Sequence, residues 1–420
     1  MIKRNPNITI FSGISGIDKR AFIKNFIKKS GKSKNVLVID FEKELLNESR
    51  NPPVSAPDMP TFLNSDDPTL KLRSIETNYS WIAKQMDKRS EKTTDIFLNM
   101  HLSYFKNSEF YPPFIPLYFK EILTKFPDSE IRIITLIDDV FAIWKKIKDR
   151  ECDGFLNTQL TLREILAWRS LESLHAEALK EHISILEEGS RRVSHFVVSI
   201  RHPFNTFNNL IFQDNPQRIY LSYPISSTRN DPKDIRDINN FRKIMHKFAE
   251  KHGTAIFDPV AIDELAMKTA LDEAISKNKI NTLVTLKKDH RWFLDPLEPL
   301  TDDVKYPIVI PRTQIEEALK DINNQIASRD YTLVDSSLFL AVYRPVYKGQ
   351  LSRGVDAEIK RANNHMKKVI MYHPEEDQKL SPKATSTHPF GNKVDQFEVK
   401  KDFVDYILKV IKQQKKRDKS

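Results

Sequence analysis

The chain has 420 residues, 40% of them hydrophobic and including 25 Phe and 12 Tyr, so it is long enough for two or three domains with buried cores. Its single cysteine, Cys152, excludes an internal disulfide framework and is typical of a reducing compartment. The longest apolar runs are strand-length, which excludes a membrane-spanning helix, and the N-terminus does not resemble a signal peptide. We therefore expect a soluble, cytoplasmic protein with no membrane partner.

The formal net charge is +10, and the basic residues are spread along the chain with one dense run at 412–419. This excess is compatible with anionic ligands such as nucleotides, and with nucleic acid. A solvated, lysine-rich surface is the simpler explanation. Since no nucleic-acid-binding motif is present, a nucleic-acid partner is compatible with the sequence but not indicated by it.

Short apolar runs alternate with longer helical patterns, which predicts an α/β protein with two Rossmann-like domains and mainly parallel sheets. In the first half, we predict strands at residues 8–12, 36–40, 95–99, 131–138 and 195–200. Helices are predicted at 19–29 and 162–188. In the second of these, Ile165, Trp168, Leu171 and Leu174 recur at helical spacing and are expected to form one apolar face.

A Pro- and Asn-rich segment, 201–217, loses this periodicity, and we place a domain boundary there. The predicted domains are 1–212 and 213–420. A second α/β series follows, with predicted strands at 218–222, 254–257, 337–342 and 368–372, and predicted helices at 232–251, 313–328 and 356–365. A last helix carries Phe403, Ile407, Val410 and Ile411 on one side.

The first candidate site is the turn Gly13-Ile-Ser15-Gly16-Ile-Asp-Lys19-Arg, between the first predicted strand and helix. In a phosphate-binding loop, backbone N–H groups and the helix N-terminus face the anion, and a lysine reaches the terminal phosphates. Asp138, at the end of a later strand, is typical of the acid that accompanies such loops.

This turn departs from the standard pattern, because Asp18 replaces a glycine and Arg20 replaces the hydroxyl residue that binds Mg²⁺. The first half nevertheless resembles the P-loop nucleoside and nucleotide kinases, including adenylate kinase-like proteins. The resemblance implies a kinase-like fold and a site for ATP and Mg²⁺. Three hypotheses stay open: a nucleotide-binding or nucleotide-sensing domain, an active kinase or NTPase, and a structural relic.

The second candidate site is Ser352-Arg-Gly354-Val-Asp-Ala-Glu358-Ile-Lys-Arg-Ala362, where a predicted strand and loop lead into a helix. Ser352 and Gly354 are placed to hold a phosphate at the helix start. Glu358, one turn inside the helix, is expected to point across the carboxyl edge of the sheet, where open α/β folds bind ligands.

This pattern resembles the nucleoside 2-deoxyribosyltransferase superfamily, and most closely its 2′-deoxynucleoside 5′-monophosphate N-hydrolases. The segment 220–231 resembles the first strand and loop of the same family. The resemblance implies a flavodoxin-like fold, a homodimer or larger assembly, and no cofactor at this site. Glu358 would attack the anomeric carbon or stabilise its cation, Ser352 would hold the 5′-phosphate, and Tyr220 would lie near the sugar and base. The remaining phosphate contacts would come from Ser226, Ser227, Thr228 and Arg229.

Cleavage of an N-glycosidic bond builds positive charge on the sugar, which a carboxylate stabilises or traps covalently. Members of the family usually carry a second acid just before the strand that precedes the glutamate, but here that position is Ser337. Asp330 is our first candidate for the second acid, and Asp335 is the other. No His or Cys cluster indicates a metal site.

The sequence thus supports two functions. The first is hydrolysis or base exchange at the N-glycosidic bond of a nucleotide, a (deoxy)nucleoside 5′-phosphate, with the N-terminal domain binding or sensing a nucleotide. The alternative is a P-loop phosphotransferase or NTPase with a C-terminal nucleotide-binding module. The identity of the base and sugar, the number of phosphates and the acceptor stay open.

Overall fold

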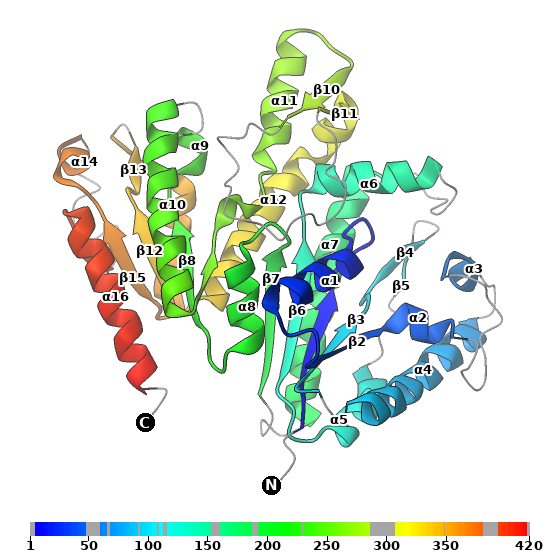
Figure 1. Ribbon diagram of the computed structural model, residues 1–420. Helices are drawn as coiled ribbons and strands as arrows, with labels where there is room; N and C mark the ends of the chain where they lie inside the picture. The colour runs from blue at the N-terminus through cyan, green and yellow to red at the C-terminus, as the bar shows by residue number, and fades with distance from the viewer. Residues whose placement is uncertain are drawn as a thin grey trace. The chain divides into compact units, whose positions relative to one another are not determined.

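The computed structural model describes residues 5–47, 59–64, 68–90, 93–106, 109–111, 116–152, 160–186, 192–228, 231–285, 307–347, 349–380 and 394–417 (Figure 1). The chain divides into two compact units, Met1–Ile200 with Leu297–Ala318, and Arg201–Pro296 with Leu319–Ser420. Each unit has one five-stranded, all-parallel sheet. This confirms the predicted α/β class with two Rossmann-like domains. Within the described residues, no helix is long and apolar enough to cross a membrane.

The first unit has the sheet order β2-β3-β1-β6-β7. Its elements are β1 (Asn7–Ser12), α1 (Lys19–Ser30), β2 (Val36–Asp40), α2 (Phe41–Leu45), α3 (Met59–Asn64), α4 (Pro68–Arg89), β3 (Asp95–Asn99), β4 (Tyr104–Lys106), β5 (Glu109–Tyr111), η1 (Pro116–Phe119), α5 (Lys120–Lys125), β6 (Ile131–Ile137), α6 (Val140–Cys152), α7 (Leu162–Leu186), β7 (Val193–Ser199) and β11 (Ile308–Pro311). The predicted strands of this half are confirmed to within two residues at each end.

Two apolar layers cover the first sheet. On one face, aliphatic side chains of β1, β2, β3 and β6 pack against α4, α5 and α7. On the other face, Phe11 and Phe97 of the sheet pack against Phe22 and Phe26 of α1, with ring centroids 5.1 to 6.3 Å apart. The two faces arise from the alternation of side chains along each strand.

The apolar face predicted for α7 is partly wrong. Ile165 and Trp168 are buried, but Leu174 is 61% exposed. The buried row continues instead through Glu172, Ala176, Leu179 and Ile183. A helix turns every 3.6 residues, so a row spaced by three drifts off the buried side after two turns. Because Glu172 is a charged residue in the buried row, a pattern of apolar residues alone did not identify that row.

The second unit has the sheet order β16-β15-β12-β8-β9. Its elements are α8 (Phe204–Phe212), β8 (Gln217–Ser222), α9 (Ile225–Thr228), α10 (Pro232–His252), β9 (Thr254–Phe257), η2 (Pro259–Ala261), α11 (Leu265–Ser276), β10 (Asn281–Val284), β12 (Phe339–Tyr343), β13 (Val346–Tyr347), β14 (Gln350–Leu351), α13 (Arg353–Asn364), β15 (Lys368–Tyr372), α14 (Glu375–Leu380), β16 (Val394–Phe397) and α16 (Lys400–Arg417). Helix α12 (Arg312–Ser336) begins in the first unit and continues in the second.

Numbered along the chain, the five strands of the second sheet lie in the order 2-1-3-4-5, which is the flavodoxin-like order. The direction of winding reverses between β8 and β12. In such sheets, ligands bind beyond the carboxyl ends of the strands at this switch point. The fold therefore directs attention to the segments that follow β8 and β12.

Helices α10 and α16 lie side by side on one face of the second sheet (Figure 1). Ile219 and Leu221 of β8 point into that layer. Tyr220 and Ser222, at the alternate positions of the same strand, point to the opposite face, where they contact Glu358 of α13.

Two predictions in the second half are corrected. The segment 201–217, predicted to be irregular, contains α8, in which Phe207, Leu210 and Ile211 are buried. Polar side chains of this helix are also satisfied internally, since Asn209 donates to the Thr254 carbonyl. Helix α12 continues to Ser336 rather than ending at 328, because no Gly or Pro interrupts it.

Candidate functional site

Glu358 lies in α13 and is only 7% exposed, with its carboxylate held from the neighbouring strand β8. The Tyr220 hydroxyl donates to Oε1 at 2.8 Å, and the Ser222 hydroxyl donates to Oε2 at 2.5 Å. Tyr220 and Ser222 share a face of β8 because they are two residues apart. The structure thus fixes both carboxylate oxygens at the switch point of the sheet.

Tyr220 holds Glu358 through a hydrogen bond from within the protein core. It is fully buried and is not among the residues that line the cavity described below. Burial, with the charges of Asp330 and Glu358, holds the pKa of Tyr220 well above its usual value, so the phenol keeps its proton. The structure therefore shows Tyr220 as a hydrogen-bond donor to the glutamate, outside the lining of the cavity.

Asp330 is brought close to Glu358 from α12, and both carboxyl groups border the same cavity. Burial and the Asp330 carboxylate raise the pKa of Glu358 to about 8, although Ser222, Tyr220 and Arg329 oppose the shift. Burial also raises the pKa of Asp330 against the opposing effect of Arg329. Two buried acids that repel each other's charge favour a state in which the pair holds one proton.

Arg329, next to Asp330, has one guanidinium nitrogen without a hydrogen-bond acceptor among the described residues. Its Nε and Nη2 donate to Asp330 Oδ1 at 3.0 and 2.9 Å. Its Nη1 is buried, lies 3.9 Å from Glu264 Oε2, and has no hydrogen-bond acceptor among the residues that the structure describes. A buried donor left without an acceptor costs about 1–3 kcal/mol. Since Arg329 lines the cavity, a ligand atom could satisfy it.

The cavity has a volume of about 120 Å³, which suits one ring rather than a whole nucleotide. Its walls come from the segment after β8, from η2 and the start of α11, from α12, and from the first turns of α13. The lining residues are Tyr223, Ile225, Ser226, Pro259, Val260, Ile262, Asp263, Glu264, Leu265, Ile326, Arg329, Asp330, Ser352, Gly354, Val355 and Glu358. The cavity thus combines an apolar wall with four acids, one guanidinium and a helix N-terminus.

The start of α13 has features of an anion site. Ser352 is the N-cap residue, but its side chain makes no capping hydrogen bond. A Cβ added at Gly354 would meet nothing within 4 Å, so packing does not require glycine there. Both residues line the cavity with Ser226. A hydroxyl and the N–H groups of a twelve-residue helix are therefore open to a negatively charged ligand.

Other predicted site residues lie elsewhere. The Thr228 hydroxyl donates to the carbonyls of Pro224 and Ile225, and Ser227 is exposed and does not line the cavity. Asp335 pairs with Arg361 at 2.5 Å instead of facing Glu358. Arg229 lies outside the described residues.

Ser337, where the resemblance implied an acid, is buried, and its hydroxyl donates to the Val334 carbonyl at 2.7 Å. It does not contribute to the cavity. Asp330 of α12, our first candidate for the second acid, does line the cavity.

A second buried network, centred on Asp258, holds one wall of the cavity. Asp258 accepts from the Tyr223 hydroxyl at 2.5 Å and from Arg242 Nε at 2.8 Å, and lies 3.2 Å from His246 Nε2. Burial opposes ionisation, but Arg242, His246 and Tyr223 outweigh it and hold the pKa of Asp258 well below its usual range. Asp258 also caps η2, so the network fixes both Tyr223 and the η2 wall.

The sequence did not reveal Ser222, Arg329 or this network. Ser222 could have been found, since it lies two residues after Tyr220 and must share its face. Arg329 carried no signal, because an arginine before an aspartate is common on any helix surface.

The phosphate-loop candidate of the first unit is closed by internal bonds. Lys19 is 5% exposed, and its Nζ donates to the Gly13 carbonyl at 2.6 Å and lies 2.9 Å from His101 Nε2. The Gly13 N–H donates to Glu172, a fully buried carboxylate that also accepts from Leu102 N and Ser103 Oγ. Burial lowers the pKa of Lys19 to about 8, partly offset by the charges of Glu172, Glu42 and Asp40.

The two glycines of this turn are required by the backbone. Gly13 and Gly16 have φ angles of 147° and 90°, and a Cβ at either would lie within 3 Å of a neighbouring atom. Ser15 is partly exposed, and Asp138 is fully buried, with Oδ1 accepting from the Asp139 N–H. The turn therefore forms as predicted, but Lys19 and Asp138 face the interior.

No protein-family model matches this chain, and no curated protein matches it.

Proposed function

We propose that the second unit cleaves the N-glycosidic bond of a nucleotide, a (deoxy)nucleoside 5′-phosphate. One observation carries the proposal: Glu358 is buried at the sheet's switch point, held on both oxygens by hydroxyl donors, and shares a cavity with a second acid.

Glu358 would act in its carboxylate form against the anomeric carbon. As the C1′–N bond breaks, its electron pair leaves with the base and positive charge develops on the sugar ring. A carboxylate stabilises that charge or traps it as a glycosyl ester, as in carboxylate-dependent glycosidases. Tyr220 and Ser222 would keep the carboxylate oriented while it reacts.

Asp330 and Arg329 would serve the departing base and the acceptor. The available Nη1 of Arg329 would donate to an acceptor atom on the base and so stabilise its developing negative charge. Water, or a second base in the transfer reaction, then adds to C1′. Asp330 would take the proton lost by water, and the departed base would finally receive it.

The start of α13 would hold the 5′-phosphate. The Ser352 hydroxyl and the free N–H groups near Gly354 lie one turn from Glu358, on the cavity wall. A phosphate bound there would place the sugar carbon over the carboxylate. Since the cavity has room for one ring, the base would enter it against the apolar wall from Tyr223 to Ile262, and the phosphate would stay outside it at the start of α13.

The test is incubation of the full chain with deoxynucleoside and ribonucleoside monophosphates, with chromatographic detection of free base. We expect release by the wild type and loss in Glu358→Gln. Asp356→Asn is the matched control, because Asp356 lies on the same helix but pairs with Lys360. Equal release by wild type and Glu358→Gln would refute the proposal.

A further inference from the structure

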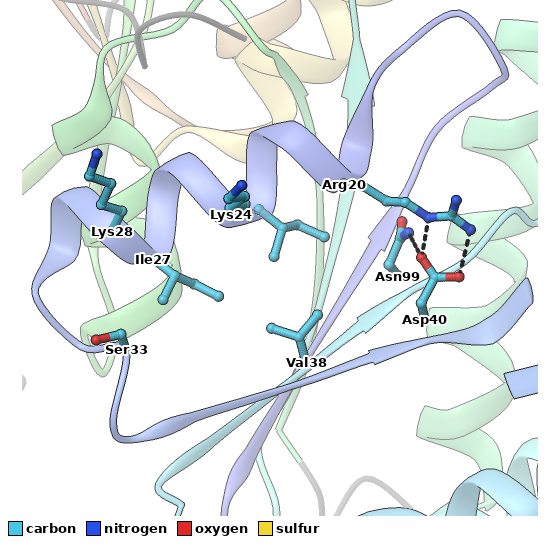
Figure 2. Close-up of a pocket in the computed structure, with 9 residues that line it drawn as sticks. Arg20, Lys24, Ile27, Lys28, Ser33, Val38, Asp40 and Asn99 are labelled. Atoms are coloured by element: carbon cyan, nitrogen blue, oxygen red, sulfur yellow. Dashed lines mark hydrogen bonds and ion pairs between the residues drawn. The ribbon is translucent and has the colours of Figure 1, made fainter. Parts of the chain in front are cut away.

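We propose that a groove between α1 and β2 of the first unit binds a small organic anion of the nucleoside monophosphate class, with an amino group on the base. The groove has a volume of about 500 Å³ and is shown in Figure 2. It lies apart from the closed turn at Lys19 and does not depend on the function proposed for the second unit.

The size of the groove favours a small molecule. Ligand sites usually measure 300–1,000 Å³ and are mostly apolar, with a few polar groups. Nine residues line this groove, whereas a stable protein interface uses roughly 20–30 residues on each side.

The middle of the groove is aliphatic. Ile27 of α1 faces Val38 of the edge strand β2 across the groove (Figure 2), and Ile23 of α1 also lines it. The α1 phenylalanines pack over β1 and β3, so β2 lies beyond their cover and Val38 stays 37% exposed. Two aliphatic walls of this kind accept a flat ring between them.

One end of the groove offers a buried hydrogen-bond acceptor. Asn99 is 6% exposed, and its Nδ2 donates to Asp40 Oδ2 at 2.7 Å. Its Oδ1 is buried and has no hydrogen-bond partner among the described residues, and Asn99 is one of the residues that line the groove. The bond to Asp40 fixes the amide orientation, so the open atom is the acceptor and calls for an N–H donor such as an amino group.

The guanidinium at that end is already paired. Arg20 donates to both oxygens of Asp40 at 2.6 and 2.9 Å and to Glu42 at 3.3 Å. Two carboxylates thus face one guanidinium, which leaves no demand for an anionic ligand at this end. The ligand's charged group is therefore expected at the other end.

The opposite end of the groove is cationic. Lys24 and Lys28 are one turn apart on α1 and have no charge partner within the described part of the chain, and Ser33 also lines the groove at this end (Figure 2). Figure 2 shows Asn99 and Asp40 at one end, Ile27 and Val38 between, and Lys28 and Ser33 at the other. An amino-bearing ring followed by a phosphate matches that order.

The experiment is photolabelling of the full chain with 8-azido-AMP, followed by mass spectrometric mapping of the labelled peptide. We expect label in the segment 20–40 and protection by AMP. Adenosine lacks the phosphate and purine riboside 5′-monophosphate lacks the amino group, so each should need roughly tenfold more to protect. Label confined to other segments would overturn the proposal.

Variants locate the anion end. In Lys24→Gln/Lys28→Gln, AMP should lose its advantage over adenosine, whereas Lys29→Gln, a lysine of α1 outside the groove, should keep it. Both exchanges are at the surface, and circular dichroism checks the fold. Unchanged protection by AMP in the double variant, or stronger protection by decanoate than by AMP, would refute a nucleotide ligand here.

Discussion

The Glu358 cavity and the Lys19 turn occupy similar positions in their units but differ in how their polar groups are hydrogen-bonded. Each places a charged side chain beyond the carboxyl end of a parallel strand, at the start of or within the next helix. At Lys19, the lysine donates to the Gly13 carbonyl and the Gly13 N–H donates to Glu172 of the same unit. At Glu358, both carboxylate oxygens are held in the same way, but Arg329 Nη1 has no hydrogen-bond partner within the described residues and the Ser352 hydroxyl makes no capping bond.

The difference shows that a motif in the right place is not yet a binding site. A binding site keeps polar groups that the protein itself does not satisfy, at a cost in stability. By that criterion the second unit carries the stronger candidate for chemistry. The turn at Lys19 is a structural element in which Lys19 Nζ and the Gly13 N–H already form hydrogen bonds within the unit.

The largest expected effect separates the two regions by activity. Glu358→Gln should lower base release by at least about 10³-fold, because the neutral amide cannot stabilise the sugar cation. Lys19→Ala should leave release within about twofold. Product chromatography measures both, and a collapse of release in Lys19→Ala would mean that the first unit controls the second.

The next effect is on pH dependence. Burial and Asp330 raise the pKa of Glu358 to about 8, and the reaction needs the carboxylate. Below that value the proton blocks the reaction, so kcat/KM for base release should fall as pH falls, by roughly 10² between pH 8 and pH 6. A profile that is flat over this range would contradict the assigned protonation state.

Arg329 tests whether open polar groups mark the site. Arg329→Met should lower kcat/KM by about 10²-fold, with the largest loss for the bases that leave least readily, since the lost donor stabilises the leaving group. Arg329→Lys, which keeps a charge beside Asp330, should recover part of the loss. Arg361→Met is the matched control, because Arg361 pairs with Asp335. An equal loss for every base would assign Arg329 a structural role.

The fold was predictable because its signals are local. Strand alternation and helix periodicity depend on neighbouring residues, and all five strands of the first sheet and four of the second were found from them, whereas β16 was missed. Helices α4, α6, α8 and α11 were not identified. In α8, polar side chains such as Asn209 bond to the next strand, which only the tertiary structure supplies.

The site was predictable only in part, for the same reason. Glu358, Ser352 and Gly354 lie within one short pattern, so the sequence located them together. Glu172 was invisible, because its three hydrogen-bond donors come from residues 69 to 159 positions away. Long-range contacts of this kind decide which groups are used internally and which stay open.

The smallest expected effect is on the free energy of unfolding, and it compares the Glu→Gln substitution in the two regions. Glu172→Gln should lower the free energy of unfolding by roughly 1–2 kcal/mol, because a carboxylate that accepts from Gly13, Leu102 and Ser103 becomes an amide with one acceptor atom. Glu358→Gln should do the reverse and raise it near pH 8.

The sign for Glu358 follows from its pKa. The folded protein keeps this proton to about pH 8, whereas an unfolded glutamate loses it near 4.5. Wild-type stability therefore falls between these values as pH rises, and the glutamine variant escapes that loss. Urea unfolding at pH 5 and pH 8 measures the difference, which should be small at the lower pH. If both variants lose stability at pH 8, the Glu358 carboxylate is not strained, and the contrast between the two regions fails.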